Sequence, residues 1–150
     1  MSTPSGAEFN KQLVRTYTQV VFNERQTGRA AEFFAPDVTW HGSTGGTIEG
    51  RENVVVLIRA LVGALEDLIA TEQDMVTDGD TVAVRYLIEA THSGELFGVP
   101  ATGRRIRWEP TSVYRIAAGK IFHAVTIDSL AAILHDVGGP PRSASSSAPT

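Results

Sequence analysis

The spacing of apolar residues changes once along this chain, near residue 65, and that change constrains the fold most. Before it, apolar residues recur at helical spacing in two segments, Ala7 to Glu24 and Arg51 to Leu65. After it, apolar and polar residues alternate over long segments separated by short turns. A chain that places its helices first and most of its strands afterwards is predicted to have an α+β fold.

The first half is predicted to be mainly helical, with one short strand. The helix from Ala7 to Glu24 has one apolar stripe, formed by Phe9, Leu13, Tyr17, Val20 and Val21. A shorter helix is predicted from Arg29 to Phe34, and Ala35-Pro36-Asp37 ends it. Val38 to His41 is then expected to form a strand, and the Gly- and Thr-rich stretch from Gly42 to Gly50 a loop.

The second half is predicted to form an antiparallel meander of four strands: Leu68–Val76, Thr81–His92, Arg104–Ile116 and Ile121–Asp128. Asp78-Gly79-Asp80 and Ala117-Ala118-Gly119-Lys120 are expected to be tight turns between neighbouring strands. Pro110 has no amide hydrogen for the ladder, so a bulge or a sheet edge is expected there. A last helix is predicted from Leu130 to Val137.

Composition limits the classes of function. The 150 residues fit one domain, expected over residues 1–138, and the polar stretch 139–150 is expected to be a disordered tail. The net charge of −4 argues against nucleic-acid binding. The absence of cysteine excludes disulfides and thiolate sites. No apolar segment is long enough to span a membrane, so we expect a soluble, cytoplasmic protein.

Several motifs between Ala90 and Lys120 fit one Gly-rich loop and the hairpin after it: Thr91-His92-Ser93-Gly94, Phe97-Gly98-Val99-Pro100, Thr102-Gly103 and Tyr114-Arg115-Ile116. With the order of elements over residues 8–138, these motifs resemble the SnoaL-like polyketide cyclases of the NTF2-like fold. The resemblance implies a curved antiparallel sheet that encloses a conical pocket together with the N-terminal helices. A pocket of that kind is suited to a small molecule.

The same resemblance implies an intramolecular aldol ring closure without a metal or other cofactor. In the family, an aspartate near the end of the last strand is the acid/base. Asp128 occupies that position if one residue near Phe122 is deleted, whereas an alignment without a gap would place Ser129 there. Asp128 also lies just before the predicted last helix, where aspartate is a favoured N-cap residue. Both roles of Asp128 therefore stay open at this point.

The chemistry explains why a carboxylate suits this reaction. A base must remove a proton next to a carbonyl, and an acid must then protonate the new alkoxide. Desolvation in an apolar pocket raises the pKa of a carboxylate, which helps both steps. The expected substrate is therefore an apolar small molecule that contains carbonyl groups.

Further candidates follow from their positions along the strands. His41 is a second catalytic candidate, since it ends the first strand, and the adjacent Trp40 is a candidate wall of the pocket. His92 lies in the Gly-rich loop motif, where it would contact substrate or fix the loop backbone. No histidine has the spacing of a metal site, so no metal is expected.

Trp108, Ser112 and Tyr114 share one side of their predicted strand if Pro110 does not shift the alternation. They would then line the cavity beside Asp128, and the tyrosine hydroxyl would stabilise an enolate oxygen. The alternative for the two aromatic residues is core packing alone.

Two other functions fit the same fold. An epoxide hydrolase would need two carboxylates and an arginine, for which Asp128, Arg85 and Glu89 are the candidates. A non-catalytic binding or accessory protein would use Asp128 only as a helix cap. A homodimer or a higher homo-oligomer is also expected, formed through the broad face of the meander.

Overall fold

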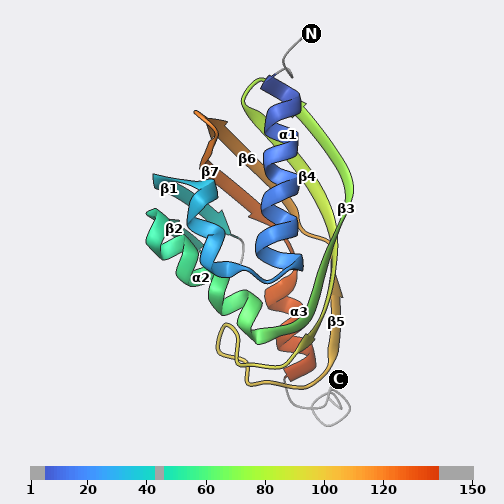
Figure 1. Cartoon of the computed structure of the whole chain (residues 1–150). Coiled ribbons are helices and arrows are strands. Elements are labelled where there is room, and N and C mark those ends of the chain that lie inside the picture. The colour runs from blue at the N-terminus through green and yellow to red at the C-terminus, as the bar shows by residue number, and fades with distance from the viewer. Residues whose placement is uncertain (1–5, 43–45, 139–150) are drawn as a thin grey trace.

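The computed structural model describes residues 6–42 and 46–138 (Figure 1). The predicted disordered tail lies outside the described residues. The helices are α1 (Gly6–Tyr17), the π-helix η1 (Thr18–Asn23), the 3₁₀ helix η2 (Thr27–Phe33), α2 (Arg51–Ala64) and α3 (Leu130–Gly138). The strands are β1 (Phe34–Gly42), β2 (Gly46–Glu49), β3 (Leu65–Asp78), β4 (Thr81–His92), β5 (Arg105–Trp108), β6 (Thr111–Ala117) and β7 (Lys120–Ile127).

The strands form one curved sheet, and the helices lie on one side of it (Figure 1). The strand order is β2-β1-β7-β6-β4-β3, and β5 also pairs with β4. Neighbouring strands are antiparallel except for β1 and β7, which run parallel. The predicted α+β fold of a curved sheet and covering helices is therefore confirmed, although the sheet is mixed rather than wholly antiparallel.

The first predicted helix, Ala7 to Glu24, changes its hydrogen-bonding pattern before it ends. α1 covers its first part, and η1 continues it as a π-helix, a rare form that often occurs at functional sites. Val14, Tyr17 and Val21 are buried against the sheet, whereas Phe9 at the start of the predicted stripe is 52% exposed. The fully buried residues of this segment therefore begin at Val14 rather than at the predicted Phe9.

Strands form in two places where the sequence pattern indicated a turn or a loop. β1 begins at Phe34 rather than Val38, and Phe34 pairs with Ile121 of β7. The segment predicted as a loop from Gly42 to Gly50 contains β2, in which Ile48 pairs with Trp40. An existing strand supplies backbone partners to a Gly-rich segment whose own strand preference is low, so tertiary context overrides the local pattern.

The strand predicted from Arg104 to Ile116 is divided at Pro110 into β5 and β6. Both parts pair with β4, through Trp108 opposite Ile88 and through Thr111 opposite Arg85. Proline has no amide hydrogen to donate, but the carbonyl oxygen of Pro110 accepts a bond of 3.0 Å from the amide of Tyr86. The predicted interruption at Pro110 is therefore present, and β4 pairs with the strand on either side of it.

Tyr17 lies at the centre of the core between the helices and the sheet. Its ring contacts four other aromatic rings, with centroid separations up to 6.0 Å, in Phe22, Phe33, Phe34 and Tyr114. Most of these contacts are edge-on, the arrangement that aromatic pairs favour. The first helix, the first strand and a late strand are thus packed around one buried side chain.

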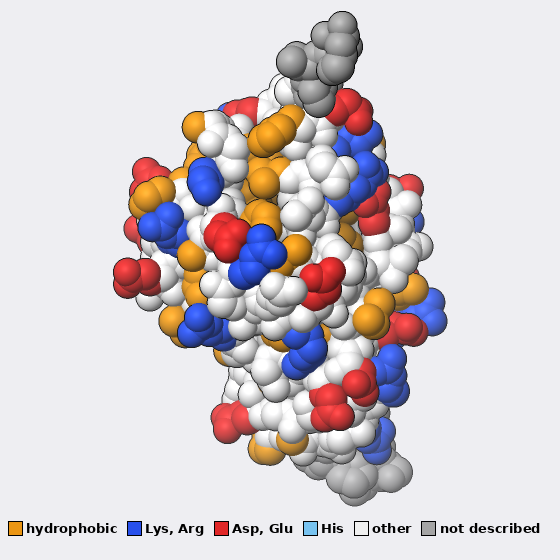
Figure 2. Space-filling view, in the orientation of Figure 1, with side chains coloured by type: hydrophobic (Ala, Val, Ile, Leu, Met, Phe, Trp, Pro, Cys, Tyr) orange, Lys and Arg blue, Asp and Glu red, His pale blue; other side chains and the backbone are white. Residues whose placement is uncertain are grey.

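The surface seen in Figure 2 carries acidic and basic side chains intermixed, without a large patch of one sign. Val76 and Ile127 are apolar residues of the strands, and they are 66% and 62% exposed. Homodimerisation through the outer face of the sheet stays a prediction. Among the described residues, no helix is both long and apolar enough to cross a membrane.

Arg25 joins the end of the first helical segment to the end of α2. Its guanidinium donates to the carbonyl oxygens of Val62 at 2.6 Å and Leu65 at 3.0 Å. Carbonyl groups at a helix C-terminus lack partners within the helix and attract a cation. The backbone of Arg25 has a φ of 59°, an unusual angle for a residue other than glycine. These bonds therefore hold a strained turn against α2.

We expect Arg25→Met to lower the free energy of unfolding by about 1–2 kcal/mol, because it removes two charge-assisted bonds. Arg29→Met is the matched control, since the ion pair of Arg29 with Glu32 is exposed, and we expect little change. Urea denaturation followed by tryptophan fluorescence measures both. Equal losses in the two variants would contradict this role of Arg25.

Candidate functional site

A pocket of about 90 Å³ lies between the helices and the inner face of the sheet, and we call it the inner pocket. Its lining is mainly aromatic and aliphatic, with a few hydroxyl groups and one carboxylate. The lining residues are Thr18, Phe22, Trp40, Leu61, Leu65, Leu68, Ala70, Tyr86, Ile88, Trp108, Pro110, Ser112, Tyr114, Thr126, Asp128 and Leu130.

Strand alternation explains which residues of the sheet reach the inner pocket. Side chains two positions apart face the same side, and Tyr86 of β4 faces inward with Ile88. Ser112 pairs with Thr126 across β6 and β7, so both hydroxyl side chains stand in one row. The three strands therefore present one continuous inward face, at whose end the chain turns into α3.

Asp128 lies at that end, between β7 and α3, and its side chain is half-buried. Its Oδ1 accepts a bond of 3.2 Å from the amide of Leu130 in the first turn of α3. The N-cap of α3 is Ser129, whose carbonyl oxygen accepts a bond of 3.0 Å from the amide of Ile133. Asp128 lies one residue before the cap position, but it bonds to the first amide of the helix and also lies on the pocket wall.

The hydroxyl groups of the inner pocket form a short polar row beside Asp128. Ser112 Oγ and Thr126 Oγ1 are 2.9 Å apart and share a hydrogen bond. Burial raises the pKa of the Tyr114 hydroxyl to about 12, and a hydrogen bond with Ser112 offsets part of the rise. Tyr114 is thus a neutral hydrogen-bond donor over the ordinary pH range. The sequence-predicted residues Trp108, Ser112 and Tyr114 are brought together here with Asp128.

His41 lies outside the inner pocket, because its neighbour Trp40 takes the inward position on β1. The His41 Nδ1 is 3.0 Å from Thr47 Oγ1 on β2, and its ring lies 5.1 Å from that of His123 on β7. The two histidines thus meet on the opposite side of the sheet from Asp128. Within the described ranges, no group of three or more His, Cys, Asp or Glu side chains could hold a metal ion.

His92 is fully buried and does not line the inner pocket. Its Nδ1 is 3.0 Å from Thr102 Oγ1, and that oxygen also accepts a bond of 3.2 Å from the amide of Arg104. The backbone of His92 exchanges bonds of 2.8 Å with the backbone of Gly103 and Arg104. The imidazole and backbone of His92 therefore hold the Gly-rich loop against the end of β4. This arrangement corresponds to the second role considered for His92, which was to fix the loop backbone.

Arg85 and Glu89 lie on the face of β4 opposite to the pocket-lining face. Arg85 forms ion pairs of 2.7 Å with Asp74 and with Glu109, and all three side chains are substantially exposed. Glu89 lies 3.9 Å from Arg107. The structure does not bring the arginine and the second carboxylate of an epoxide hydrolase to Asp128.

The pocket residues that were not singled out from the sequence include Thr18 and Tyr86. Their hydroxyl oxygens are 2.5 Å apart in a buried hydrogen bond. Tyr86 shares the alternation of Val82 and Val84, so strand parity alone could have placed it on the inner face. No local signal identifies Thr18, because its direction depends on the π-helical turn that it begins.

All three tyrosines of the chain are buried, and burial is the largest cause of their raised pKa values. At pH values below the usual tyrosine pKa of 10.0, the raised pKa values have no effect on stability, because tyrosine is neutral in both the folded and the unfolded chain. At higher pH the unfolded chain ionises first, so we expect stability to fall as the pH rises toward the folded pKa of about 12 for Tyr114. Tyrosinate absorbance and far-UV circular dichroism should therefore change together. Tyrosinate forming near its usual pKa with the helical signal intact would contradict the burial of these rings.

Thr102 and Thr47 offer a matched pair, since each hydroxyl lies 3.0 Å from a histidine Nδ1. We expect Thr102→Val to lower the free energy of unfolding by about 1–3 kcal/mol, because buried polar groups lose their partner. Thr47→Val, at an exposed position, should change it by less than about 0.5 kcal/mol. Thermal or urea unfolding of the two variants measures the difference, and a cost no larger for Thr102 would refute the structural role of His92.

Solved structures share this fold over nearly their whole length. A candidate SnoaL-like polyketide cyclase from Jannaschia sp. CCS1 is 18% identical, with a TM-score of 0.78 over 94% of this chain and 99% of that one. IdmH, a candidate polyketide cyclase from Streptomyces antibioticus, is 27% identical, with a TM-score of 0.70 over 87% of this chain and 99% of that one. A protein with a ketosteroid isomerase-like fold from Catenulispora acidiphila DSM 44928 is 18% identical, with a TM-score of 0.68 over 93% and 96%.

The comparison of sequences agrees with that of structures. Among curated proteins, no relative matches the chain. The family model described as SnoaL-like polyketide cyclase matches residues 11–137, which include every strand and nearly every helical residue described above. The chain therefore belongs to the SnoaL-like polyketide cyclase family.

Proposed function

We propose that this protein catalyses an intramolecular aldol-type ring closure, without a cofactor, on an apolar polyketide-like molecule that contains carbonyl groups. Asp128 is the acid/base of the reaction. The observation that supports this most is the position of the Asp128 carboxylate in a pocket that is otherwise lined by aromatic, aliphatic and hydroxyl side chains.

The reaction needs one proton acceptor that later becomes the donor. The Asp128 carboxylate removes a proton from the carbon next to a carbonyl, which leaves an enolate. The enolate carbon then bonds to a second carbonyl carbon of the same molecule, and that carbonyl oxygen becomes an alkoxide. The alkoxide takes the proton back from the carboxylic acid, so the enzyme returns to its starting state.

The hydroxyl row stabilises the negative charge that forms on oxygen. Tyr114 remains neutral because burial keeps its pKa high, and its hydroxyl donates to the enolate or alkoxide oxygen. Ser112 and Thr126 form a hydrogen-bonded pair on the same wall. The aromatic walls, with Trp40 and Trp108, exclude water and hold an apolar ring.

Family membership supports this chemistry. IdmH, which is 27% identical, is described as a candidate polyketide cyclase. The fold itself does not specify a reaction, since one scaffold hosts many chemistries. The proposal therefore rests on the carboxylate and the hydroxyl row more than on the shape of the sheet.

One observation favours a second function, a non-catalytic protein that binds an apolar small molecule. The amide of Leu130 donates to Asp128 Oδ1, as it would if the residue served only to begin α3. In that case the inner pocket would bind a ligand without chemistry. The substitution of Asp128 by asparagine separates the two functions, because the asparagine side-chain oxygen can accept the same bond from Leu130 but the amide cannot act as a base.

We expect Asp128→Asn to retain stability within about 0.5 kcal/mol while its catalytic rate falls at least about 100-fold. The measurement is the exchange of hydrogen for deuterium next to the carbonyl of cyclohexanone, a single small ring, followed by NMR in D₂O. This ketone reports proton removal without requiring the natural substrate. Asp128→Ala should lose both activity and about 1 kcal/mol of stability.

Asp37→Asn is the control, because Asp37 is an exposed carboxylate of β1 that does not line the inner pocket. Its exchange rate should equal that of the unaltered protein. If the unaltered protein and Asp128→Asn are both folded and catalyse exchange at equal rates, the catalytic proposal is wrong and the non-catalytic binding protein is favoured.

A further inference from the structure

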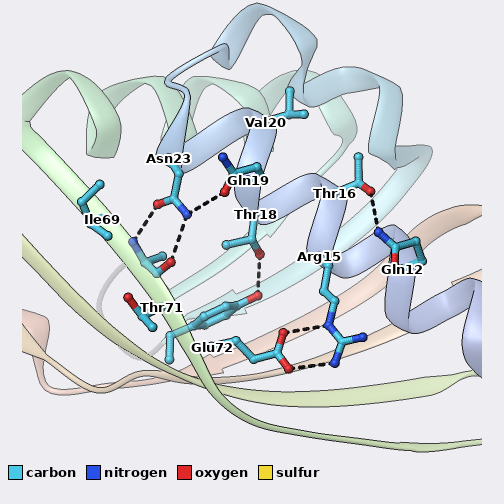
Figure 3. A pocket seen from close by; sticks show the side chains of 12 residues that line it. Gln12, Arg15, Thr16, Thr18, Gln19, Val20, Asn23, Ile69, Thr71 and Glu72 are labelled. Carbon is cyan, nitrogen blue, oxygen red and sulfur yellow. Dashed lines mark hydrogen bonds and ion pairs between the residues drawn. The ribbon is translucent and has the colours of Figure 1, made fainter.

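A second and larger depression lies beside the inner pocket, on the outer side of the seam between the first helical segment and β3 (Figure 3). We call it the outer groove, and its volume is about 540 Å³. Most of its polar side chains come from α1 and η1, and the groove is lined by Gln12, Arg15, Thr16, Thr18, Gln19, Val20, Asn23, Ile69, Ala70, Thr71, Glu72 and Tyr86.

The two cavities meet at three shared residues, Thr18, Ala70 and Tyr86. The hydrogen bond between the hydroxyls of Thr18 and Tyr86 lies where they meet, and these residues are 8% and 6% exposed. In Figure 3 this bond is the dashed line that starts at the hydroxyl of Thr18. The division between the inner pocket and the outer groove thus depends on side chains rather than on backbone.

The seam is fastened on either side of that division. Arg15 binds Glu72 through two bonds of 2.9 Å. The side-chain amide of Asn23 binds both the amide and the carbonyl of Ala70, at 2.7 and 3.0 Å. Thr18 lies between these two contacts along the helix, so its shift would open a passage without separating α1 from β3.

The volumes of the two cavities indicate that they bind one ligand together. Pockets for drug-sized ligands measure about 300–1,000 Å³, and the inner pocket alone, at about 90 Å³, is far below that range. A single small ring group is the most that it accommodates. The inner pocket and the outer groove together fall within the range, so a larger molecule would have to extend through the division.

The lining of the outer groove indicates what such an extension carries. Its amides and hydroxyls, in Gln12, Thr16, Gln19 and Thr71, both donate and accept hydrogen bonds. Its two charged side chains, Arg15 and Glu72, neutralise each other in a direct ion pair. The groove therefore favours neutral hydroxyl groups over a phosphate or a carboxylate.

We propose that the inner pocket and the outer groove form one two-part site, divided by the Thr18–Tyr86 hydrogen bond. Its ligand joins an apolar ring, bound beside Asp128, to a neutral, hydroxyl-rich extension such as a glycosyl group, bound along the groove. This inference rests on the proposed function for the role of the inner pocket, and it adds the class of substrate.

The test compares phenol with phenyl β-D-glucopyranoside in an NMR titration of the ¹⁵N-labelled full chain. The only two tryptophans, Trp40 and Trp108, both line the inner pocket, so their indole signals report it. The side-chain amide signals of Gln12 and Gln19 report the groove. We expect phenol to shift the indole signals alone, and the glucoside to shift both sets with a Kd about fivefold lower, as expected for one or two added hydrogen bonds.

Variants test whether the outer groove causes the lower Kd of the glucoside. Gln12→Ala and Gln19→Ala should weaken binding of the glucoside about two- to tenfold and leave that of phenol unchanged. Gln26→Ala, in the turn between η1 and η2 and outside the groove, should change neither. Thr18→Ala should speed binding of the glucoside. A glucoside that binds no tighter than phenol, or that shifts only one set of signals, overturns the two-part site, and so does the absence of binding by both probes.

This outcome is distinct from failure of the proposed function. Binding is measured without turnover, and Asp128→Asn should retain the difference between the two probes. Loss of that difference concerns the groove, and loss of deuterium exchange in Asp128→Asn concerns the chemistry.

Discussion

The parallel pairing of β1 with β7 is the interaction on which the inner pocket depends. It sets Trp40 beside Ala124 and His41 beside Val125, and so joins the first strand of the chain to the last. Without it, Trp40 and Asp128 would belong to separate parts of the molecule. The pairing also decides that Trp40 faces the cavity and that His41 meets His123 on the other side. The position of Trp40 relative to Asp128 therefore depends on a contact between distant parts of the sequence.

Local signals predicted most elements, and those that failed did so for identifiable reasons. Alternation and tight turns placed β4, β6 and β7 well, since these strands pair with their neighbours in sequence. β2 was missed because its Gly-rich sequence forms a strand only against β1. The parallel register of β1 was also not predictable, because no residue near it indicates its partner in β7.

Residues of the candidate site could be predicted where the alternation of side chains along a strand alone decides which side chains face the inner pocket. Trp108, Ser112 and Tyr114 face the pocket, and they do so even though Pro110 interrupts the strand, because β5 and β6 both pair with β4. The choice between Trp40 and His41 needed the tertiary register. Thr18 needed the π-helical turn, which no residue type indicates. The sequence therefore identifies residues of the sheet wall better than those of the helical wall.

The capping bond and the proposed reaction of Asp128 are better understood as one arrangement than as competing roles. A carboxylate at the end of a strand is free to rotate unless something holds it, and the amide of Leu130 restricts its direction through Oδ1. Catalytic groups need to be held by a second contact if they are to meet a substrate in one geometry. The start of α3 supplies that contact at the point where the inward face of β7 ends. The first amide of α3 is thus what positions the carboxylate in the proposed mechanism, and the hydroxyls of Ser112 and Thr126 lie on the same wall.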